Sequence, residues 1–321
     1  MAGAAVIGHG GMISRPEHAA QYAALLRPTT QYNIEMHVSV VDSLTKIPAS
    51  DWNGLAGVAN PFLRHEFLAA LESSGCAGAK TGWAPQHLVL HADGPLAGRL
   101  LGAIPMYLKN HSYGEYVFDW AWANAYENAG LRYYPKLVVG VPFSPVTGPR
   151  LLAAAGTDSV TIKNRLIEGA VTHMQACGAS SLHWLFVTEE DAGLLEAQGH
   201  MRRSGYQFHW KNPGCGDFDK FLATFTAQKR KKIKRERRYV REAGIVMETL
   251  TGAAIEPGHW DIFHEFYRST IRAHGAIPYL SREFFHKLGE TLSERVVLVF
   301  ARLGADYVAG ALNLRGADTL Y

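Results

Sequence analysis

The sequence is poor in cysteine and contains no long apolar run. Its cysteines, Cys76, Cys177 and Cys215, are odd in number and form no CxxC pair. This pattern excludes a disulfide framework and a cysteine zinc site, and it fits a reducing compartment. No apolar stretch reaches the ~18–20 residues that a membrane helix needs. We therefore expect a cytoplasmic protein without a transmembrane segment.

The signatures of several enzyme classes are also missing. There is no GxSxG motif and no P-loop, which argues against hydrolase and nucleoside triphosphatase chemistry. Two strings, HEFLA at His65 and HEFYR at His264, begin like the helix of a zinc protease but lack its second histidine. The fifteen histidines show no ligand spacing. We therefore predict no metal site.

The composition describes a globular chain of about two domains. Of 321 residues, 47% are apolar and 19% are charged, which excludes a disordered or fibrous protein. Residues 1–31 are rich in small residues and poor in acidic ones, and they lack a secretory pattern. We interpret them as a flexible leader, with a transit peptide as the alternative.

One segment carries most of the positive charge. Gln228 to Arg241 holds nine Lys/Arg and one Glu, which leaves 23 basic and 28 acidic residues elsewhere, a net of −5. The overall net charge of +3 is thus the sum of an acidic body and one basic segment. A local anionic partner is more plausible than a surface that binds nucleic acid throughout.

Strand and helix patterns alternate along the chain. Up to residue 212 we expect helices at 60–75, at 162–176 and near Glu189, and strands at 33–41, 86–94, 99–111, 113–120, 137–142, 181–187 and 206–212. Beyond it we expect a long polar helix or helix pair at 217–244, helices at 259–275 and 281–292, and strands at 244–250, 295–304, 306–316 and from 317. This order is typical of an α/β fold.

A weak internal repeat divides the chain. HEFLAALESSG, HLVLHADG and LLGAIPMYLKNHSYGEYVF recur in order as REFFHKLGETL, VVLVFARLG and YVAGALNLRGADTLY. Such self-similarity indicates a duplicated unit. We predict one domain at 32–212 and, with the basic helical segment, a second at 213–321. The second copy stops within its third strand, so we expect it to be incomplete at the C-terminus.

Several long strings resemble a known family. YGEYVFDWAWANAYENAGLRYYPKLVVGVPFSPVTGPRLL, KRKKIKRERR, HGAIPYLSREFF and VAGALNLRGADTLY look like the FemAB-like peptidoglycan biosynthesis/recognition family of the GNAT acyltransferase superfamily. The resemblance implies an α/β (α+β) fold of two tandem GNAT-like domains, with mixed central sheets flanked by helices. It also implies transfer of an acyl or aminoacyl group to an amine. The donor would be an acyl-CoA or an aminoacyl-tRNA.

Such transfer needs a base, an oxyanion donor and groups that bind the donor's phosphates. Asp119 is a candidate base or a partner for the acceptor ammonium. Lys136 could stabilise an oxyanion or bind phosphate, and His274 could act as base or position a substrate. The fold places the donor between two splayed strands, which we expect at 113–120 and 137–142. Neither RLLGAI at Arg99 nor REAGIV at Arg241 fits the donor-phosphate loop of acetyl-CoA-dependent relatives.

Two further groups complete the candidate site. Polar-tipped aromatics and loop residues suited to a peptide or sugar are Trp120, Tyr126, Tyr133, Tyr134, Thr147, Arg150 and Tyr279. Basic residues for phosphate or RNA are Arg230, Lys231, Lys234, Arg235 and Arg238. The alternatives are a buried aromatic layer and a solvated charged helix.

Three functions stay open at this point. The first is acyl or aminoacyl transfer to an amine acceptor, which could be a peptidoglycan-precursor-like or peptide substrate. The second is an acetyl-CoA-dependent N-acetyltransferase of a small metabolite or peptide. The third is a non-catalytic module that recognises a cell-wall precursor or RNA.

Overall fold

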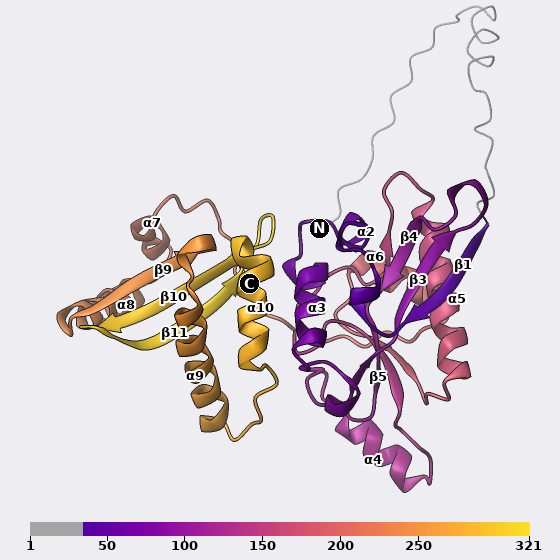
Figure 1. The fold of residues 1–321 in the computed structure, drawn as a ribbon. Coiled ribbons are helices and arrows are strands. Elements are labelled where there is room, and N and C mark those ends of the chain that lie inside the picture. The colour runs from indigo at the N-terminus through magenta and orange to yellow at the C-terminus, as the bar shows by residue number, and fades with distance from the viewer. Residues whose placement is uncertain (1–34) are drawn as a thin grey trace, which may run out of the picture. The chain divides into compact units, whose positions relative to one another are not determined.

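The computed structural model describes residues 35–321 (Figure 1). Its N-terminal half contains two four-stranded sheets. One has the strand order β1-β3-β4-β7 and is antiparallel. The other has the order β2-β5-β6-β8, in which only β6 and β8 run parallel. The strands are β1 (Met36–Val41), β2 (Trp83–Pro85), β3 (His87–Ala92), β4 (Leu100–Ile104), β5 (Met106–Lys109), β6 (Lys136–Val139), β7 (Leu152–Ala153) and β8 (Leu182–Trp184).

Pro105 separates β4 from β5, where the sequence predicted one strand. Proline has no backbone N–H and interrupts a ladder. The chain therefore leaves the first sheet after Ile104 and enters the second at Met106. The N–H of Met106 donates to Nδ1 of His87 at 3.2 Å.

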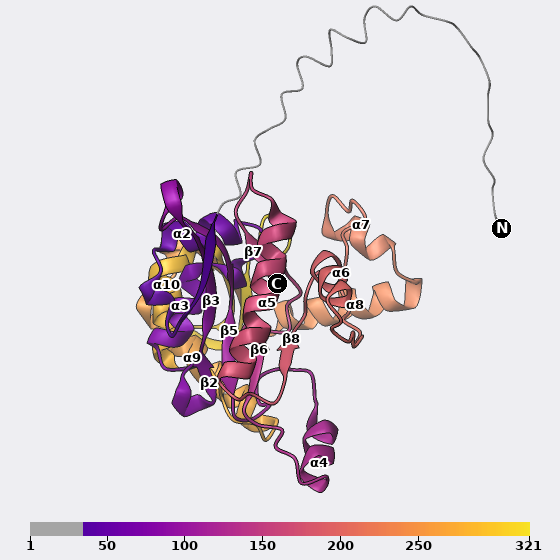
Figure 2. The same ribbon diagram turned by 90° about the vertical axis from the view of Figure 1, so that its right-hand side faces the viewer.

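Helix α5 (Ser159–Ala176) lies against β3 and β4 (Figure 2). The side chain of Asp158 caps it by accepting from Thr161 N. A Cβ on Gly102 would lie 2.6 Å from Cγ2 of Ile162. The absence of a side chain there lets this helix approach the sheet closely.

The helix predicted at 60–75 is divided in two. Asn60 caps a short 3₁₀ turn, η2 (Pro61–Leu63), by accepting from Phe62 N. Arg64 then adopts an extended conformation and α3 (His65–Ser73) follows. The other helices of this half are α2 (Ala49–Ala56), α4 (Trp120–Asn128) and α6 (Glu189–Ala197).

The C-terminal half is a three-stranded antiparallel sheet with the order β11-β10-β9. The strands are β9 (Ile245–Thr251), β10 (Val296–Leu303) and β11 (Asp306–Leu314). Helices α9 (Pro257–Ala273) and α10 (Arg282–Leu292) follow β9 in the chain, and Figure 1 shows both helices beside the sheet. Trp260, Phe263, Phe284, Phe285 and Phe300 are buried in this core.

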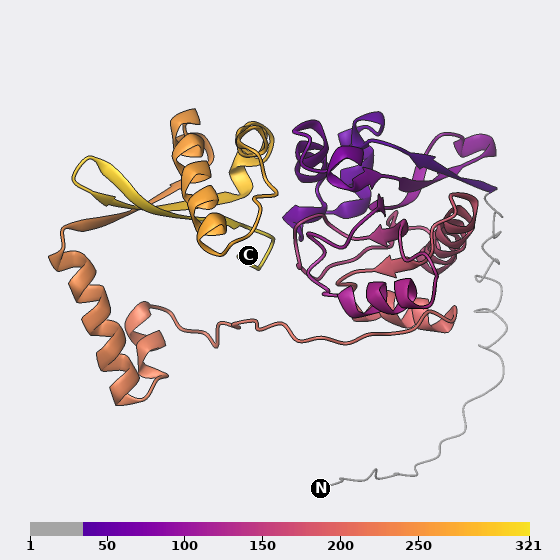
Figure 3. The same cartoon turned by 90° about the horizontal axis from the view of Figure 1, so that it is seen from below.

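Several predicted elements are wrong. Residues 113–120 form no strand: Tyr116 and Phe118 have φ of 60° and 49°, which strand pairing does not allow, and α4 begins at Trp120. Residues 206–212 also form no strand. They belong to an exposed extended segment that leads to α7 (Phe218–Ala223) (Figure 3). Of the strand expected from 317, only the bridge between Arg315 and Leu320 forms.

The α/β fold class with mixed sheets flanked by helices is confirmed. Residues 36–321 form one compact unit, and the Phe67 and Phe284 rings of its two halves lie 5.7 Å apart. The predicted boundary at 212 stays a prediction. The predicted leader, residues 1–31, lies outside the described residues. Within residues 35–321 no helix is both long enough and apolar enough to span a bilayer.

Candidate functional site

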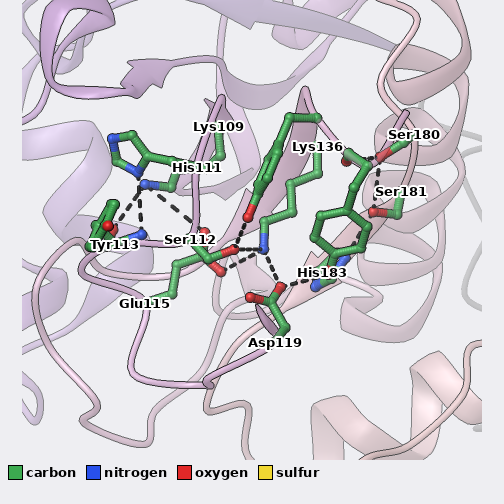
Figure 4. Close-up of polar contacts among 12 residues, drawn as sticks. Lys109, His111, Ser112, Tyr113, Glu115, Asp119, Lys136, Ser180, Ser181 and His183 are labelled. Carbon is green, nitrogen blue, oxygen red and sulfur yellow. Dashed lines mark hydrogen bonds and ion pairs between the residues drawn. The ribbon is translucent and has the colours of Figure 1, made fainter. Parts of the chain in front are cut away.

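A buried cluster of charges is centred on Lys136 (Figure 4). Its Nζ donates to Glu115 Oε2 at 2.8 Å, to Asp119 Oδ2 at 2.5 Å and to Ser112 Oγ at 2.9 Å. Strand β6 supplies Lys136, the residue before α4 supplies Asp119, and the loop between β5 and α4 supplies the others. The structure thus brings together two of the three predicted catalytic residues, Asp119 and Lys136.

A second lysine lies beside the first. Lys109 on β5 is the register partner of Lys136 on β6. Its Nζ donates to Tyr113 O at 3.1 Å, lies 4.0 Å from Glu115 Oε1 and sits 3.7 Å above the Trp83 ring centre. Two lysines and two carboxylates therefore lie together in one buried cluster. Buried charges are tolerated when each has a partner of opposite sign, as these have.

Burial shifts the proton affinities of this cluster in different directions. Burial lowers the pKa of Lys109 to about 7, against the attraction of Glu115. Burial raises the pKa of Glu115, partly offset by Lys136. For Asp119, burial alone would raise the pKa, but hydrogen bonds led by that from Lys136 lower it to about 2. Asp119 is hence a carboxylate at neutral pH and a weak base, whereas Lys109 titrates near neutrality.

Two tyrosines contact the charge cluster through their hydroxyl groups. Tyr133 donates its hydroxyl to Asp119 Oδ2 at 2.6 Å, and the Tyr134 hydroxyl lies 2.8 Å from Ser112 Oγ. The rings of these tyrosines meet edge to face at 5.0 Å. Both residues were predicted to bind substrate, and the structure uses their hydroxyls to hold the cluster.

The cluster is closed to solvent. The side chain of Lys136 is 0% exposed and that of Asp119 is 3% exposed. Glu115 Oε1 and Asp119 Oδ1 are buried without a hydrogen-bond partner among the described residues. Neither carboxylate is therefore accessible from the surface, and the arrangement is suited to holding charge and orienting hydroxyls.

His183 on β8 borders the cluster (Figure 4). Burial, followed by the nearby Lys136, lowers its pKa to about 4, so the ring is neutral at neutral pH. One ring nitrogen lies 2.8 Å from Ser181 Oγ. Sequence reasoning missed His183, Lys109, Glu115 and Ser112, because strand register and loop packing bring them together.

The other predicted substrate residues lie in different surroundings. Trp120 is exposed at the start of α4, and Tyr126 lines a pocket described below. Thr147 is exposed, and its Oγ1 lies 3.4 Å from Oε1 of Gln207. Arg150 is fully buried, and its guanidinium donates to three backbone carbonyls. This geometry gives Arg150 a structural role in place of the expected contact with a substrate anion.

Tyr279 and His274 follow α9. The Tyr279 ring stacks on Phe143 at 4.8 Å, so a ligand has access to one ring face at most. His274 is the exposed C-terminal cap of α9. No hydrogen bond or ion pair within residues 35–321 joins His274 to the charge cluster. Its catalytic role stays a prediction.

The basic segment forms helix α8 (Ala227–Glu242), which has no buried residue. The region predicted as one helix or a pair is the pair α7 and α8. Lys234 and Arg238 pair with Asp219 and Glu242, both at 3.4 Å. The remaining predicted phosphate ligands of this helix are Arg230, Lys231 and Arg235. Most side chains of this helix are exposed, and their role in binding stays a prediction.

The pair of splayed strands expected at 113–120 and 137–142 is wrong. The parallel pair is β6 and β8, joined through α5, with Val138 opposite His183. A parallel pair needs a crossover, which α5 provides, whereas residues 113–120 lie in a loop. Within the described residues no group of three or more His, Cys, Asp or Glu is placed to hold a metal ion.

Comparison with known proteins gives one family, and the solved structures that resemble this chain include two distant ones. The first structure is the aminoglycoside antibiotic 6'-N-acetyltransferase AAC(6')-Ih from Acinetobacter baumannii, with 14% identity and a TM-score of 0.34 over 56% of this chain and 100% of that one. The second is a probable acetyltransferase, with 13% identity and a TM-score of 0.31 over 56% and 99%. No curated protein matches.

The family match covers most of the chain. The FemAB-like family, described as peptidoglycan biosynthesis/recognition, matches residues 43–321. This range includes the charge cluster, α8 and the C-terminal sheet. The chain therefore belongs to the FemAB-like family, and this membership supports an acyltransferase-type function while leaving the substrate open.

Proposed function

We propose that this protein is an N-acyltransferase that moves an acyl or aminoacyl group onto an amine acceptor. The observation that carries the proposal is the family match over residues 43–321. The description of the family favours an acceptor of the peptidoglycan-precursor or peptide type. The free cysteines Cys76, Cys177 and Cys215 favour a cytoplasmic location for this reaction.

The acceptor in this proposal binds beside the tyrosines that cover the charge cluster. The Tyr133 ring is buried and the Tyr134 ring is half-buried, and their hydroxyls contact Asp119 and Ser112. With a pKa of about 2, Asp119 is too weak a base to remove a proton from an ammonium group efficiently. Its role is to fix the Tyr133 hydroxyl and to supply a negative charge.

The donor is an acyl-CoA or an aminoacyl-tRNA, both of which carry phosphates. Helix α8 exposes Lys231, Lys234, Arg235 and Arg238 to solvent, and a helix of like charges favours an anionic partner. Release of counterions from such a surface makes binding dependent on salt. The number of charges on one helix favours the longer phosphate chain of tRNA over the few phosphates of CoA.

A non-catalytic recognition module is the second candidate. The observation in its favour is the burial of Lys136 and Asp119 together with their mutual neutralisation. Such a cluster can stabilise a binding surface without taking part in chemistry. An acetyl-CoA-dependent N-acetyltransferase is a variant of the first proposal that differs in the donor.

The test is a transfer assay with both donors. Purified protein is incubated with acetyl-CoA or with charged tRNA and an amine-bearing cell-wall peptide, and the N-acylated product is detected by mass spectrometry. Asp119→Asn should lower kcat more than it raises KM, whereas the control Asp261→Asn, which changes an exposed partner of Arg282, should not. Retention of the peptide without transfer from either donor would instead establish the recognition module.

A further inference from the structure

An open pocket of about 280 Å³ lies on the outer side of the tyrosines. It is lined by Tyr126, Leu131, Arg132, Tyr134, Gly178 and Ser180. The residues come from α4, from the loop that leads to β6, and from the turn between α5 and β8. The volume suits a group of amino-acid size, since pockets for drug-sized ligands begin at ~300 Å³.

One wall of the pocket carries an uncompensated positive charge. Arg132 is exposed, and within residues 35–321 no carboxylate lies within 4.0 Å of its guanidinium. By contrast, two other exposed arginines of the N-terminal half, Arg165 and Arg202, each form an ion pair with a carboxylate. A planar guanidinium that faces a pocket is well suited to a carboxylate, which it binds with two hydrogen bonds.

The rest of the lining suits a cation. Helix α5 ends there, and Gly178 turns the chain with φ of 65°. The C-terminal end of a helix carries partial negative charge. Tyr126 and Tyr134 add aromatic faces, which attract ammonium groups. The lining thus combines one positive charge with a helix end of negative potential and two aromatic rings.

The same tyrosines connect the pocket to the charge cluster. Tyr134 lines the pocket, and its hydroxyl lies 2.8 Å from Ser112 Oγ, which accepts from Lys136 at 2.9 Å. Tyr126 packs edge to face on Tyr133 at 5.2 Å. A ligand in this pocket therefore contacts residues whose positions the cluster fixes. The second pocket of this half, which Asp51 and Arg99 line, includes none of these residues.

We propose that this pocket binds a zwitterion of the amino-acid type, with its carboxylate on Arg132 and its ammonium group between the tyrosines and the end of α5. Arg132 is then a specificity-determining residue. This inference rests on the proposed function, because the bound ammonium group is the acceptor amine. It narrows the acceptor to molecules in which a carboxylate lies within about one residue of the amine.

Binding without any donor tests the inference. The full chain, labelled with ¹⁵N, is titrated with L-alanine, with L-alaninamide, which lacks the carboxylate, and with N-acetyl-L-alanine, which lacks the ammonium group. L-alanine should shift the amide signals of Gly178 and Ser180 in a saturable way. Each analogue should bind at least tenfold more weakly, which corresponds to the loss of one charged contact.

Two matched variants locate the site. Arg132→Gln should weaken L-alanine binding at least tenfold, whereas Arg99→Gln, in the second pocket, should leave it unchanged. Both side chains are exposed, so both variants should fold, which circular dichroism would show. Equal binding of the amide, no saturable shift at Gly178 and Ser180, or a loss confined to Arg99→Gln would each overturn the inference. Transfer to another amine in the separate donor assay would leave the proposed function standing.

Discussion

Replacing Lys136 by methionine should lower the free energy of unfolding more than any comparable substitution at the protein surface. Lys136 is fully buried and is the cation nearest to both Glu115 and Asp119, at 2.8 and 2.5 Å. Lys136→Met keeps most of the side-chain volume but leaves Asp119 without a positive partner. Breaking a buried pair from one side costs about 3–5 kcal/mol of unfolding free energy.

Lys109 limits this loss. Its Nζ already lies 4.0 Å from Glu115 Oε1, so Glu115 keeps a cation when Lys136 is removed. Asp119 then accounts for most of the cost, and Asp119→Asn in the Lys136→Met background should restore stability. The restored part measures the coupling between the two residues in a double-mutant cycle.

The pH dependence has a definite sign. The native pKa of Asp119 is about 2, below its ordinary value of 3.8, so its contribution to stability is complete above about pH 4. The contribution, about 2 kcal/mol for this shift, is lost as the pH falls from about 4 towards 2. Without Lys136, the largest cause that lowers the pKa of Asp119 is removed, so its pKa should lie higher than in the wild type. The difference in stability between wild type and Lys136→Met should therefore shrink on acidification.

Urea unfolding followed by circular dichroism at pH 7 and pH 3 measures these effects. The matched control is Lys46→Met, which removes the exposed pair between Lys46 and Asp42 at 2.6 Å. Exposed pairs contribute roughly 0–1 kcal/mol, so the control should be nearly neutral. If Lys136→Met cost no more than Lys46→Met, or if its cost grew on acidification, the electrostatic account of the cluster would be refuted.

Three further outcomes follow from the same structure. Lys109→Met should abolish a rise of stability between about pH 7 and 10.5, because the lowered pKa makes the unfolded chain bind more protons in that window, as urea titrations at several pH values would show. Gly114→Ala should cost more than the control Gly130→Ala in thermal unfolding. Both glycines have positive φ, but only the Cβ at Gly114 meets a ring, that of Phe143, at 2.6 Å. Reversing the exposed charges of α8 to Glu should weaken tRNA binding in filter assays and flatten its dependence on salt; unchanged affinity would remove α8 from donor binding.

Local signals were sufficient for many elements. The Ser281 cap and the apolar spacing of residues 281–292 predicted α10, whose side-chain cap forms as expected. The alternation in 295–304 and 306–316 predicted two strands, which form β10 and β11 and pair antiparallel. In each case the pattern of one segment agrees with the contacts that the segment makes in the fold.

The two wrong strands had the same alternation without a partner strand. Aromatic residues occupy every second position from Tyr116 to Trp120, but the carbonyl of Tyr113 accepts from Trp83 Nε1 and Lys109 Nζ. Backbone groups engaged in this way are not available to a ladder. Tyr206, Phe208 and Trp210 alternate equally well and are exposed, with no strand beside them in the described chain. Alternation predicts a strand only where the topology supplies a neighbour.

The candidate site shows the same limit. Asp119, Tyr133, Tyr134 and Lys136 lie in one segment, and sequence reasoning grouped them correctly by proximity. Lys109 was missed because only the register of β5 on β6 places it opposite Lys136. A lysine at the end of an apolar strand gives no local sign that it is buried.

The buried cluster favours an indirect part for its carboxylates in any reaction. Asp119 is 3% exposed and has a pKa of about 2, so it neither meets a substrate nor removes a proton readily. Its Oδ2 accepts a hydrogen bond from the hydroxyl of Tyr133 at 2.6 Å, and Tyr133 is itself buried. Because that hydrogen bond favours the protonated hydroxyl, it raises the pKa of Tyr133 in addition to the effect of burial. Tyr133 is then a fixed hydrogen-bond donor that keeps its own proton. Another group must therefore remove the proton from an acceptor amine.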